Sequence, residues 1–391
     1  MSINLLPIDR QRPLDPPDEI AAAPAQDPIV PMTYADGKEG WLVTGQHAAR
    51  EVLASPAFSN RIVHIHSPIE RPGLADMKIE EVPGMFNRMD GVDHARIRRM
   101  LIGQFTVRRM TLLEPLITKI TEDHLDEMER HGPPLDLIPA FTLPIPSLVI
   151  CELLGVPGDM RSSFQNDAKG MLNLDADSEV VMKAWASLSQ TMATLIAEKR
   201  AHPADDLLSG LIAEGELTEP ELVMIAMILL IAGHETTANM LALGTYTLLR
   251  HPDQRDALLR DPATAVEELL RYLSIIHIGP IRTALEDVEI DGHLIRAGDP
   301  VTISVPGANR DPAKFGDPDT LDVTRNAHGH LAFGHGIHQC LGQQLARVEM
   351  RIGFAALLRR LPSLRLAGEV RFRSRMSIYG LHNLPVAWDP Q

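Results

Sequence analysis

One long apolar segment near the middle of the chain limits the folds that this sequence can adopt. Thr218 and Glu221 have the S/T-x-x-E spacing with which a helix N-terminus satisfies its free N–H groups. Pro252 ends the helical pattern after His251. The spacing predicts a helix of about 32 residues, or about 48 Å at 1.5 Å per residue. Because residues 222–232 are apolar nearly all round the helix, we expect it to be buried at the centre of a large fold.

The apolar run in this helix does not read as a membrane anchor. Residues 222–233 are too few to span a bilayer, and Glu221 and Glu235 bracket them. The first ten residues carry no signal-peptide pattern, and two cysteines cannot build a disulfide framework. We therefore expect a soluble cytoplasmic protein that has no membrane partner.

Composition and charge exclude further classes of protein and of partner. The chain has 391 residues, of which 45% are hydrophobic, so it can bury a substantial core. Its 37 basic and 52 acidic residues give a net charge of −15, which argues against nucleic acid as a partner. No repeat, low-complexity block or Gly/Ser linker divides it. We expect a monomer with one domain over residues 1–391.

Most of the remaining chain has helical periodicity, with a small strand contribution. Helical apolar spacing recurs in five further segments, the last of which begins at Cys340. These are residues 93–102, 114–130, 180–202, the segment from Asp261, and 340–360. Strand patterns lie at residues 40–44 and 301–305, and a hairpin is indicated by residues 288–295 around Asp291-Gly292. The class is mainly α, with a small β part near residues 1–60 and 285–305.

A glycine-rich loop, residues 333–342, presents a cysteine. Three glycines in ten residues allow the backbone to lie flat against a bulky group. Cys340 stands at the predicted start of helix 340–360, where the helix dipole favours the thiolate that binds metals. A buried, inert thiol is the alternative, and we assign that role to Cys151 in its apolar surroundings. At Cys340 the glycine spacing favours a metal ligand.

A polar interruption occurs inside the long helix. Glu235 stands beside Thr236 and Thr237, and an acid in a buried helix is costly unless a polar group meets it. A threonine hydroxyl can bond the carbonyl four residues earlier and open a groove for water or a small ligand. A fully satisfied structural interruption is the alternative. A zinc-protease motif is excluded, because Ala238 stands where the second histidine would be.

Two further pairs are weaker signals when taken alone. Glu268 and Arg271 are one helical turn apart, a spacing that usually marks a surface ion pair. His94 and Arg98 are also one turn apart, and Arg282 follows much later. Solvated basic side chains explain these equally well.

Taken together, these segments resemble the cytochrome P450 family of haem-thiolate monooxygenases. Residues 333–342 match its F-G-x-G-x-H-x-C-x-G signature, residues 232–236 match A-G-x-[DE]-T, and residues 268–271 match E-x-x-R. The sequence around both longer motifs is similar to that of soluble bacterial members that tailor secondary metabolites. The resemblance implies a triangular helical prism with haem b between the long central helix and the helix after the cysteine loop.

The resemblance also implies roles for single residues. Cys340 would be the axial iron ligand, whose electron donation helps to cleave the O–O bond of O2. Glu235 would relay protons through water, and Thr236 would hydrogen-bond the dioxygen. Glu268 and Arg271 would be structural. Four residues would hold the haem propionates: His94, Arg98, Arg282 and His338. Four would contact substrate: Ala232, Gly233, Thr237 and Ile278.

One position departs from the family pattern. The family often extends the Glu268–Arg271 pair with an arginine in a P-x-R-F segment, and this sequence has Thr320 there. A threonine cannot supply a guanidinium. We expect Arg325 or a main-chain carbonyl to take its place.

The implied reaction needs electrons and an apolar small-molecule substrate. The chain has no dinucleotide fingerprint and no Fe–S cysteine cluster, so a ferredoxin and its reductase are expected. Arginines cluster near the cysteine face, at positions 96, 98, 99, 108 and 109 and at 347, 351, 359 and 360 against Glu349. Loops at residues 62–89, 164–177 and 275–281, mostly aliphatic, predict an adaptable pocket for a macrolide, another polyketide or a terpenoid, to be hydroxylated or epoxidised.

Two alternatives from other classes stay open at this point. One is a non-haem metal-binding protein that uses His328, His330, His335, His338 and Cys340. The other is a haem protein without monooxygenase activity. The Glu235-Thr236 pair speaks against the second, since a proton relay is useful only where O–O cleavage occurs.

Overall fold

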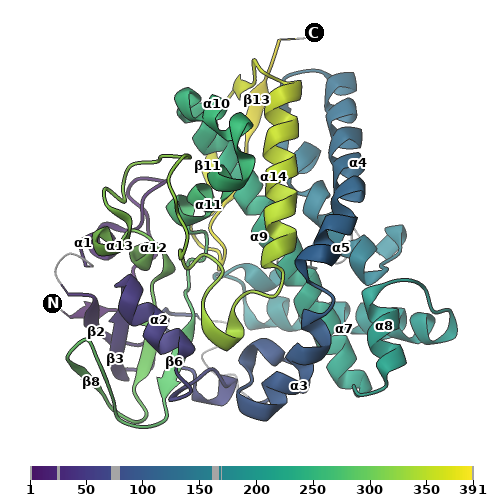
Figure 1. The fold of residues 1–391 in the computed structure, drawn as a ribbon. Helices are drawn as coiled ribbons and strands as arrows, with labels where there is room; N and C mark the ends of the chain where they lie inside the picture. Colours follow the sequence, from purple (N-terminus) through teal and green to yellow (C-terminus); the bar gives the residue numbers. More distant parts are fainter. Residues whose placement is uncertain (1, 24–26, 72–79, 161–166, 169, 390–391) are drawn as a thin grey trace.

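The long central helix is present as expected. The computed structural model describes residues 2–23, 27–71, 80–160, 167–168 and 170–389. Helix α9 spans Glu219–Arg250, 32 residues, and the Thr218–Glu221 capping box is formed. By length and composition α9 could cross a membrane, but 72% of its most apolar window is buried by protein. It is therefore the core helix that the sequence predicts, and it runs through the middle of the molecule (Figure 1).

The other helices surround α9, and most of the predicted ones are found with shifted ends. The longer ones are α2 (Gln46–Ala54), α3 (Gly91–Ile102), α4 (Val107–His131), α5 (Pro144–Leu154), α7 (Ser178–Ala201), α8 (Leu207–Glu214), α10 (Pro252–Arg260), α11 (Pro262–Leu273) and α14 (Gln343–Arg360). Short ones are α1 (Asp18–Ala22), α12 (Val305–Ala308) and α13 (Pro312–Phe315).

Two helix starts differ from the prediction. Helix α4 begins at Val107 rather than residue 114, because Thr106 caps it by accepting a hydrogen bond from the Arg109 N–H. Helix α14 begins at Gln343 rather than at Cys340. Cys340 therefore lies in the loop before the helix, three residues from its first turn.

Over the described residues, the β part forms one larger sheet and three small ones. The six-stranded sheet has the order β1-β2-β3-β9-β6-β4. Its strands are β1 (Ile3–Asn4), β2 (Ile29–Thr33), β3 (Glu39–Val43), β4 (Phe58–Ser59), β6 (Ile281–Ala284) and β9 (Pro300–Ile303). Strands β7 (Val288–Ile290) and β8 (His293–Ile295) form the predicted hairpin.

The sequence did not predict the C-terminal strands. Strand β13 (Pro385–Ala387) pairs with β10 (Arg365–Leu366) on one side and with β5 (Leu135–Asp136) on the other, and β11 (Arg371–Phe372) pairs with β12 (Leu381–Asn383). Each has two or three residues, which is too short for an alternating pattern to be visible. This C-terminal hairpin contacts α9, so it brings late residues to the central helix.

Two regions of different character pack together. One large apolar core joins α4, α5, α7, α9, α11 and α14, while smaller cores lie under the six-stranded sheet. Figure 1 shows the helical region on one side and the sheet with α1, α2 and the α12–α13 segment on the other. The glycine-rich loop leads into α14, which packs against α9. The fold thus brings two sequence motifs, more than 90 residues apart, to the centre of the molecule.

Candidate functional site

The cysteine loop is a tight turn that only glycine permits at two positions. Gly334 and Gly336 have φ values of +68° and +74°, a region that favours glycine. At Gly336 a Cβ atom would lie 2.4 Å from the carbonyl oxygen of Leu53. The Cys340 N–H donates to the Phe333 carbonyl at 2.8 Å and closes the loop. The glycine spacing therefore fixes where the thiol is presented.

The Cys340 thiol keeps accessible surface although protein surrounds it. Burial raises the pKa of the thiol, while the N–H groups of Gly342 and Gln343 and the charges of Arg98 and Arg347 oppose that rise. The expected favouring of the thiolate by the start of the helix is therefore present but is outweighed by desolvation. Cys151, in contrast, is fully buried in the apolar core, as expected.

Helix α9 has a break in its burial at the polar interruption. Residues 231–233 and Thr236 keep accessible surface, whereas most of the helix is buried. The Thr236 hydroxyl donates to the Ala232 carbonyl at 2.7 Å, the bond to the carbonyl four residues earlier. This segment is therefore an accessible stretch with one accessible hydroxyl within a buried helix.

The Glu235 carboxylate has partners that sequence reasoning missed. Arg373, from the C-terminal hairpin, donates to it at 3.0 Å, and the Asn239 side-chain amide donates at 3.1 Å. Asn239 lies one turn along α9 and could have been found by helical spacing. Arg373 is 138 residues away, and no local signal relates it to Glu235. The buried acid is thus an ion-paired carboxylate.

Three of the four predicted propionate-binding residues meet around the cysteine loop. The rings of His94 and His338 are 4.1 Å apart, and the buried Nε2 atoms of both lack a hydrogen-bond partner. Arg98 donates to the Gln339 carbonyl at 2.5 Å. Desolvation is the largest cause that lowers the pKa of His94, to about 4.

The fourth, Arg282, comes from strand β6. It donates to the Asn60 side-chain oxygen at 2.9 Å, and its charge lowers the pKa of His338, for which burial is the larger cause. The Asp90 carboxylate is 3.9 Å from the His338 ring, beyond hydrogen-bond distance. The set therefore combines two arginine cations with two imidazoles whose buried Nε2 atoms lack partners, which suits carboxylates.

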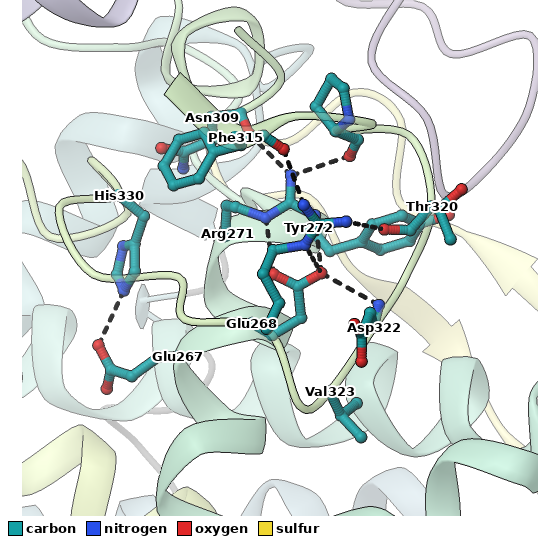
Figure 2. Close-up of polar contacts among 12 residues, drawn as sticks. Glu267, Glu268, Arg271, Tyr272, Asn309, Phe315, Thr320, Asp322, Val323 and His330 are labelled. Atoms are coloured by element: carbon teal, nitrogen blue, oxygen red, sulfur yellow. Dashed lines mark hydrogen bonds and ion pairs between the residues drawn. The ribbon is translucent and has the colours of Figure 1, made fainter. Parts of the chain in front are cut away.

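The Glu268–Arg271 pair is buried rather than on the surface. Both side chains are 0% exposed and are joined by two hydrogen bonds of 2.7 and 2.8 Å. Arg271 also donates to the carbonyls of Asn309 and Pro318, each at 2.9 Å (Figure 2). The pair ties α11 to the segment before the cysteine loop.

Arg325 takes the place of the arginine that is missing at position 320. The Arg325 Nε atom lies 3.2 Å from the Glu268 carboxylate. Its other nitrogens donate to four main-chain carbonyls, those of Phe315, Gly316, Asp317 and Thr320. Both expected replacements are therefore present, and Thr320 contributes only its carbonyl.

The predicted substrate residues are not all equally accessible. Ala232 is exposed, and Gly233 and Ile278 are half-buried. Thr237 is 3% exposed and lies beside the Glu349 carboxyl of α14, so it faces away from the accessible stretch of α9. The predicted pocket segments lie in part outside the described residues, at 72–79, 164–166 and 169.

The histidines of the non-haem alternative do not form a metal site. His330 is engaged by Glu267, at 3.0 Å. Within the described ranges, the group of side chains spaced closely enough for a metal ion is His47, Glu51 and Asp291, all exposed and far from the loop in sequence. The five His and Cys side chains therefore do not converge as a ligand set.

The arginine cluster is smaller than the sequence suggests, because remote acids neutralise it. Arg347 pairs with Glu267 and Arg351 with Glu114. Arg96 pairs with Glu221, and Arg360 with three acids of α4: Glu122, Asp126 and Glu129. Among the ion pairs of the described residues, none involves Arg108 or Arg109, both exposed at the start of α4. These two remain as cations available to a partner, and so does Arg359 of α14, which is exposed and in none of these ion pairs.

An accessible thiol on a glycine loop, a break in the burial of the central helix, and two arginines with two histidines beside the loop define a haem-thiolate oxygenase. The cytochrome P450 family model matches residues 169–265 and 262–363, and the chain belongs to the cytochrome P450 family. It is 47% identical over 386 residues to cytochrome P450 105C1 of a Streptomyces species, with 97% of each chain covered.

Solved structures agree with this assignment. The chain matches CYP105P1, crystallised with filipin I, at a TM-score of 0.92 and 41% identity, with all of both chains covered. It matches MycCI of Micromonospora griseorubida, a mycinamicin VIII C21 methyl hydroxylase, at a TM-score of 0.91 and 38% identity, covering 99% and 100% of the chains. The protein is a monooxygenase that uses haem, O2 and a small-molecule substrate.

The described residues fit this cofactor. The orphaned Nε2 atoms of His94 and His338, with Arg98 and Arg282, are donors suited to two carboxylates. The positive φ values at Gly334 and Gly336 let the loop lie flat beneath a planar group.

Proposed function

We propose that this P450 inserts one oxygen atom from O2 into a C–H bond or an alkene of an apolar secondary metabolite. The bound haem supplies the oxidising chemistry. Cys340 is the proposed iron ligand, and His94, Arg98, Arg282 and His338 hold the propionates. The observation that carries this assignment is the Cys340 thiol, which the closed glycine loop presents beside donors that lack partners.

Thr236 and Glu235 are the proposed proton-handling residues. Thr236 lies in the accessible stretch of α9, and its hydroxyl is held to the Ala232 carbonyl. In this orientation its oxygen can accept a hydrogen bond, and its single proton can donate to a group on the distal side when the bond to Ala232 is exchanged. Glu235 is buried and paired with Arg373, so it exchanges protons with Thr236 only through water.

The proposed substrate is a macrolide, another polyketide or a terpenoid. Solved relatives were crystallised with filipin I and mycinamicin VIII. In this chain Ile278 and Ile276 lie half-buried after α11, where branched aliphatic side chains suit an apolar ligand. Ala232 and Gly233 have small side chains, so they leave space for a ligand next to this part of α9.

Two measurements test this function. The reduced protein with CO should show the strongly red-shifted Soret band of a thiolate-ligated haem, and Cys340→Ser should abolish that band while Cys151→Ser keeps it. A substrate panel of polyketides and terpenoids, with a surrogate ferredoxin system, should give oxygenated products by mass spectrometry. If the red-shifted band is present but no compound of the panel gives a product or a substrate-induced spectral shift, the result would favour a haem protein without this activity.

The proposed electron donor is an acidic ferredoxin that docks at the start of α4. Arg108 and Arg109 are exposed cations, and Val107 and Leu112 beside them are 63% and 73% exposed. A basic surface with apolar side chains suits an acidic redox partner. Arg99 adds a third cation, only loosely paired with Glu216 at 3.7 Å.

Charge reversal tests this docking surface. Arg109→Glu should raise the KM for ferredoxin severalfold but leave peroxide-driven turnover unchanged. Arg130→Glu, at the other end of α4, makes the same charge change and should alter neither the KM for ferredoxin nor the peroxide-driven turnover. Equal loss in both assays, or equal effects of the two variants, would count against docking here.

We also propose that the protein is a cytoplasmic monomer with a single domain over residues 1–391. The support is that one large core spans helices from α4 to α14. Sedimentation at several concentrations tests the oligomeric state.

A further inference from the structure

Glu267 is adjacent to the buried Glu268 on α11 but serves a different set of partners. Its carboxylate accepts from Arg347 Nε at 2.6 Å and Nη2 at 3.0 Å, a bidentate pair. It also lies 3.0 Å from His330 Nε2 (Figure 2). His330 precedes the cysteine loop and Arg347 follows it in α14, so one carboxylate joins the two ends of the loop.

Both partners of Glu267 also contact the loop or the residue directly before it. The Arg347 guanidinium lies 4.5 Å from the centre of the Phe333 ring, a cation–π distance. The His330 Nδ1 atom is 3.2 Å from the Ala332 N–H. Phe333 in turn accepts the Cys340 N–H through its carbonyl at 2.8 Å. Contacts therefore run without a gap from Glu267 to the backbone of the cysteine.

The charge state and burial of Glu267 suit this role. Burial alone would raise the pKa of its carboxyl, but the hydrogen bonds from His330 and Arg347 outweigh this and lower the pKa to about 2. The side chains of Glu267, Arg347 and His330 are 15%, 27% and 3% exposed, so solvent screens their contacts only in part.

We propose that Glu267 is a positioning residue that clamps the cysteine loop, acting through Arg347 on Phe333 and through His330 on the start of the loop. The proposal rests on the proposed role of Cys340 as the iron ligand. Without the clamp, the loop loosens and the thiolate is lost as ligand before the fold unfolds.

A matched ion pair on the same helix provides the control. Arg351, one turn after Arg347, pairs with Glu114 of α4 at 2.5 Å, and it makes no contact with the cysteine loop among the described side-chain hydrogen bonds. Glu267→Gln and Glu114→Gln thus each remove one carboxylate charge from an arginine of α14. Only the first arginine lies on Phe333.

The test follows the thiolate band of the reduced CO complex in mild urea, with far-UV circular dichroism recorded in parallel. Glu267→Gln should speed loss of the band about tenfold, the factor for one charge-assisted hydrogen bond, at urea concentrations where helicity is retained. Glu114→Gln should not. Equal rates in the two variants, or loss of the band only together with helicity, would overturn the proposal.

A second background shows whether the effect passes through Arg347. In an Arg347→Met protein, Glu267→Gln should add less to the rate, because only the His330 contact is left to lose, whereas an undiminished effect would overturn the route through Arg347. If Glu267→Gln does not yield folded protein, Arg347→Met against Arg351→Met makes the same comparison. Absence of the thiolate band in the unmodified protein would instead refute the assignment of Cys340.

Discussion

The Glu235 carboxylate and the Arg373 guanidinium form an ion pair of 3.0 Å, with side chains only 6% and 10% exposed. The pair joins the polar stretch of α9 to the C-terminal hairpin. Asn239 supports it by donating to the Glu235 carboxylate and accepting from Arg373 at 3.4 Å. The proposed proton-relay acid is thus tied to a hairpin that the sequence did not predict.

Removal of Arg373 should be strongly destabilising. Arg373→Met leaves a buried carboxylate without its cation, which costs about 3–5 kcal/mol. Glu235→Gln in the same protein should recover much of this, since no unpaired charge remains. Urea unfolding of the haem-loaded protein measures both. Arg371→Met, two residues earlier and exposed, is the control, and equal losses from the two arginine variants would contradict the importance of the pair.

Loss of the Thr236 hydroxyl should uncouple the reaction. In Thr236→Val the isosteric side chain cannot donate a hydrogen bond, so product formation should fall about 10²-fold or more while reductant is still consumed and peroxide accumulates. Thr247→Val is matched, because the Thr247 hydroxyl makes the same bond four residues back in α9, to Leu243 at 2.7 Å. Unchanged product per reductant in Thr236→Val would remove this residue from the proposed role.

The sequence predicted the elements that have strong local signals. The capping box at Thr218 and the stop at Pro252 defined α9, and Asp291-Gly292 defined the β7–β8 hairpin. In each case a few neighbouring residues determine the structure. The glycines and Cys340 of the loop were readable for the same reason.

Interactions between distant segments were not predictable. The sequence indicated a basic patch that included Arg347, Arg351 and Arg360. Their acidic partners were not visible there, because they lie 80 to 238 residues away in the sequence. Glu349 counted as a compensating charge, yet burial raises the pKa of its carboxyl to about 8, so it is mostly neutral at pH 7. Such pairing and desolvation depend on tertiary packing, which local patterns do not carry.

Glu349 should make stability depend on pH. It is 1% exposed in α14, and desolvation raises the pKa of its carboxyl to about 8, against about 4.3 in an unfolded chain. Below about pH 4.3 both states are protonated. Between about 4.3 and 8 the unfolded chain releases the proton and the folded protein keeps it, so this contribution to stability falls as pH rises.

Glu349→Gln, which stays neutral, should therefore be more stable than the unmodified protein by about 3 kcal/mol near pH 7 and by little at pH 4.5. Urea unfolding at a series of pH values measures the difference. Glu198→Gln, an exposed residue of α7, should show no such trend. A difference that does not grow with pH would mean that Glu349 is ionised in the folded state.

Arg325, rather than position 320, should carry the stabilising role beside Glu268 and Arg271. Arg325→Leu removes the contact with Glu268 and leaves four main-chain carbonyls to find other donors, so it should cost about 3–5 kcal/mol and weaken haem retention. Thr320→Ala should change stability by less than about 0.5 kcal/mol, because that side chain is exposed. Thermal unfolding and the amplitude of the reduced CO band measure both effects. A larger loss from Thr320→Ala than from Arg325→Leu would return the structural role to position 320.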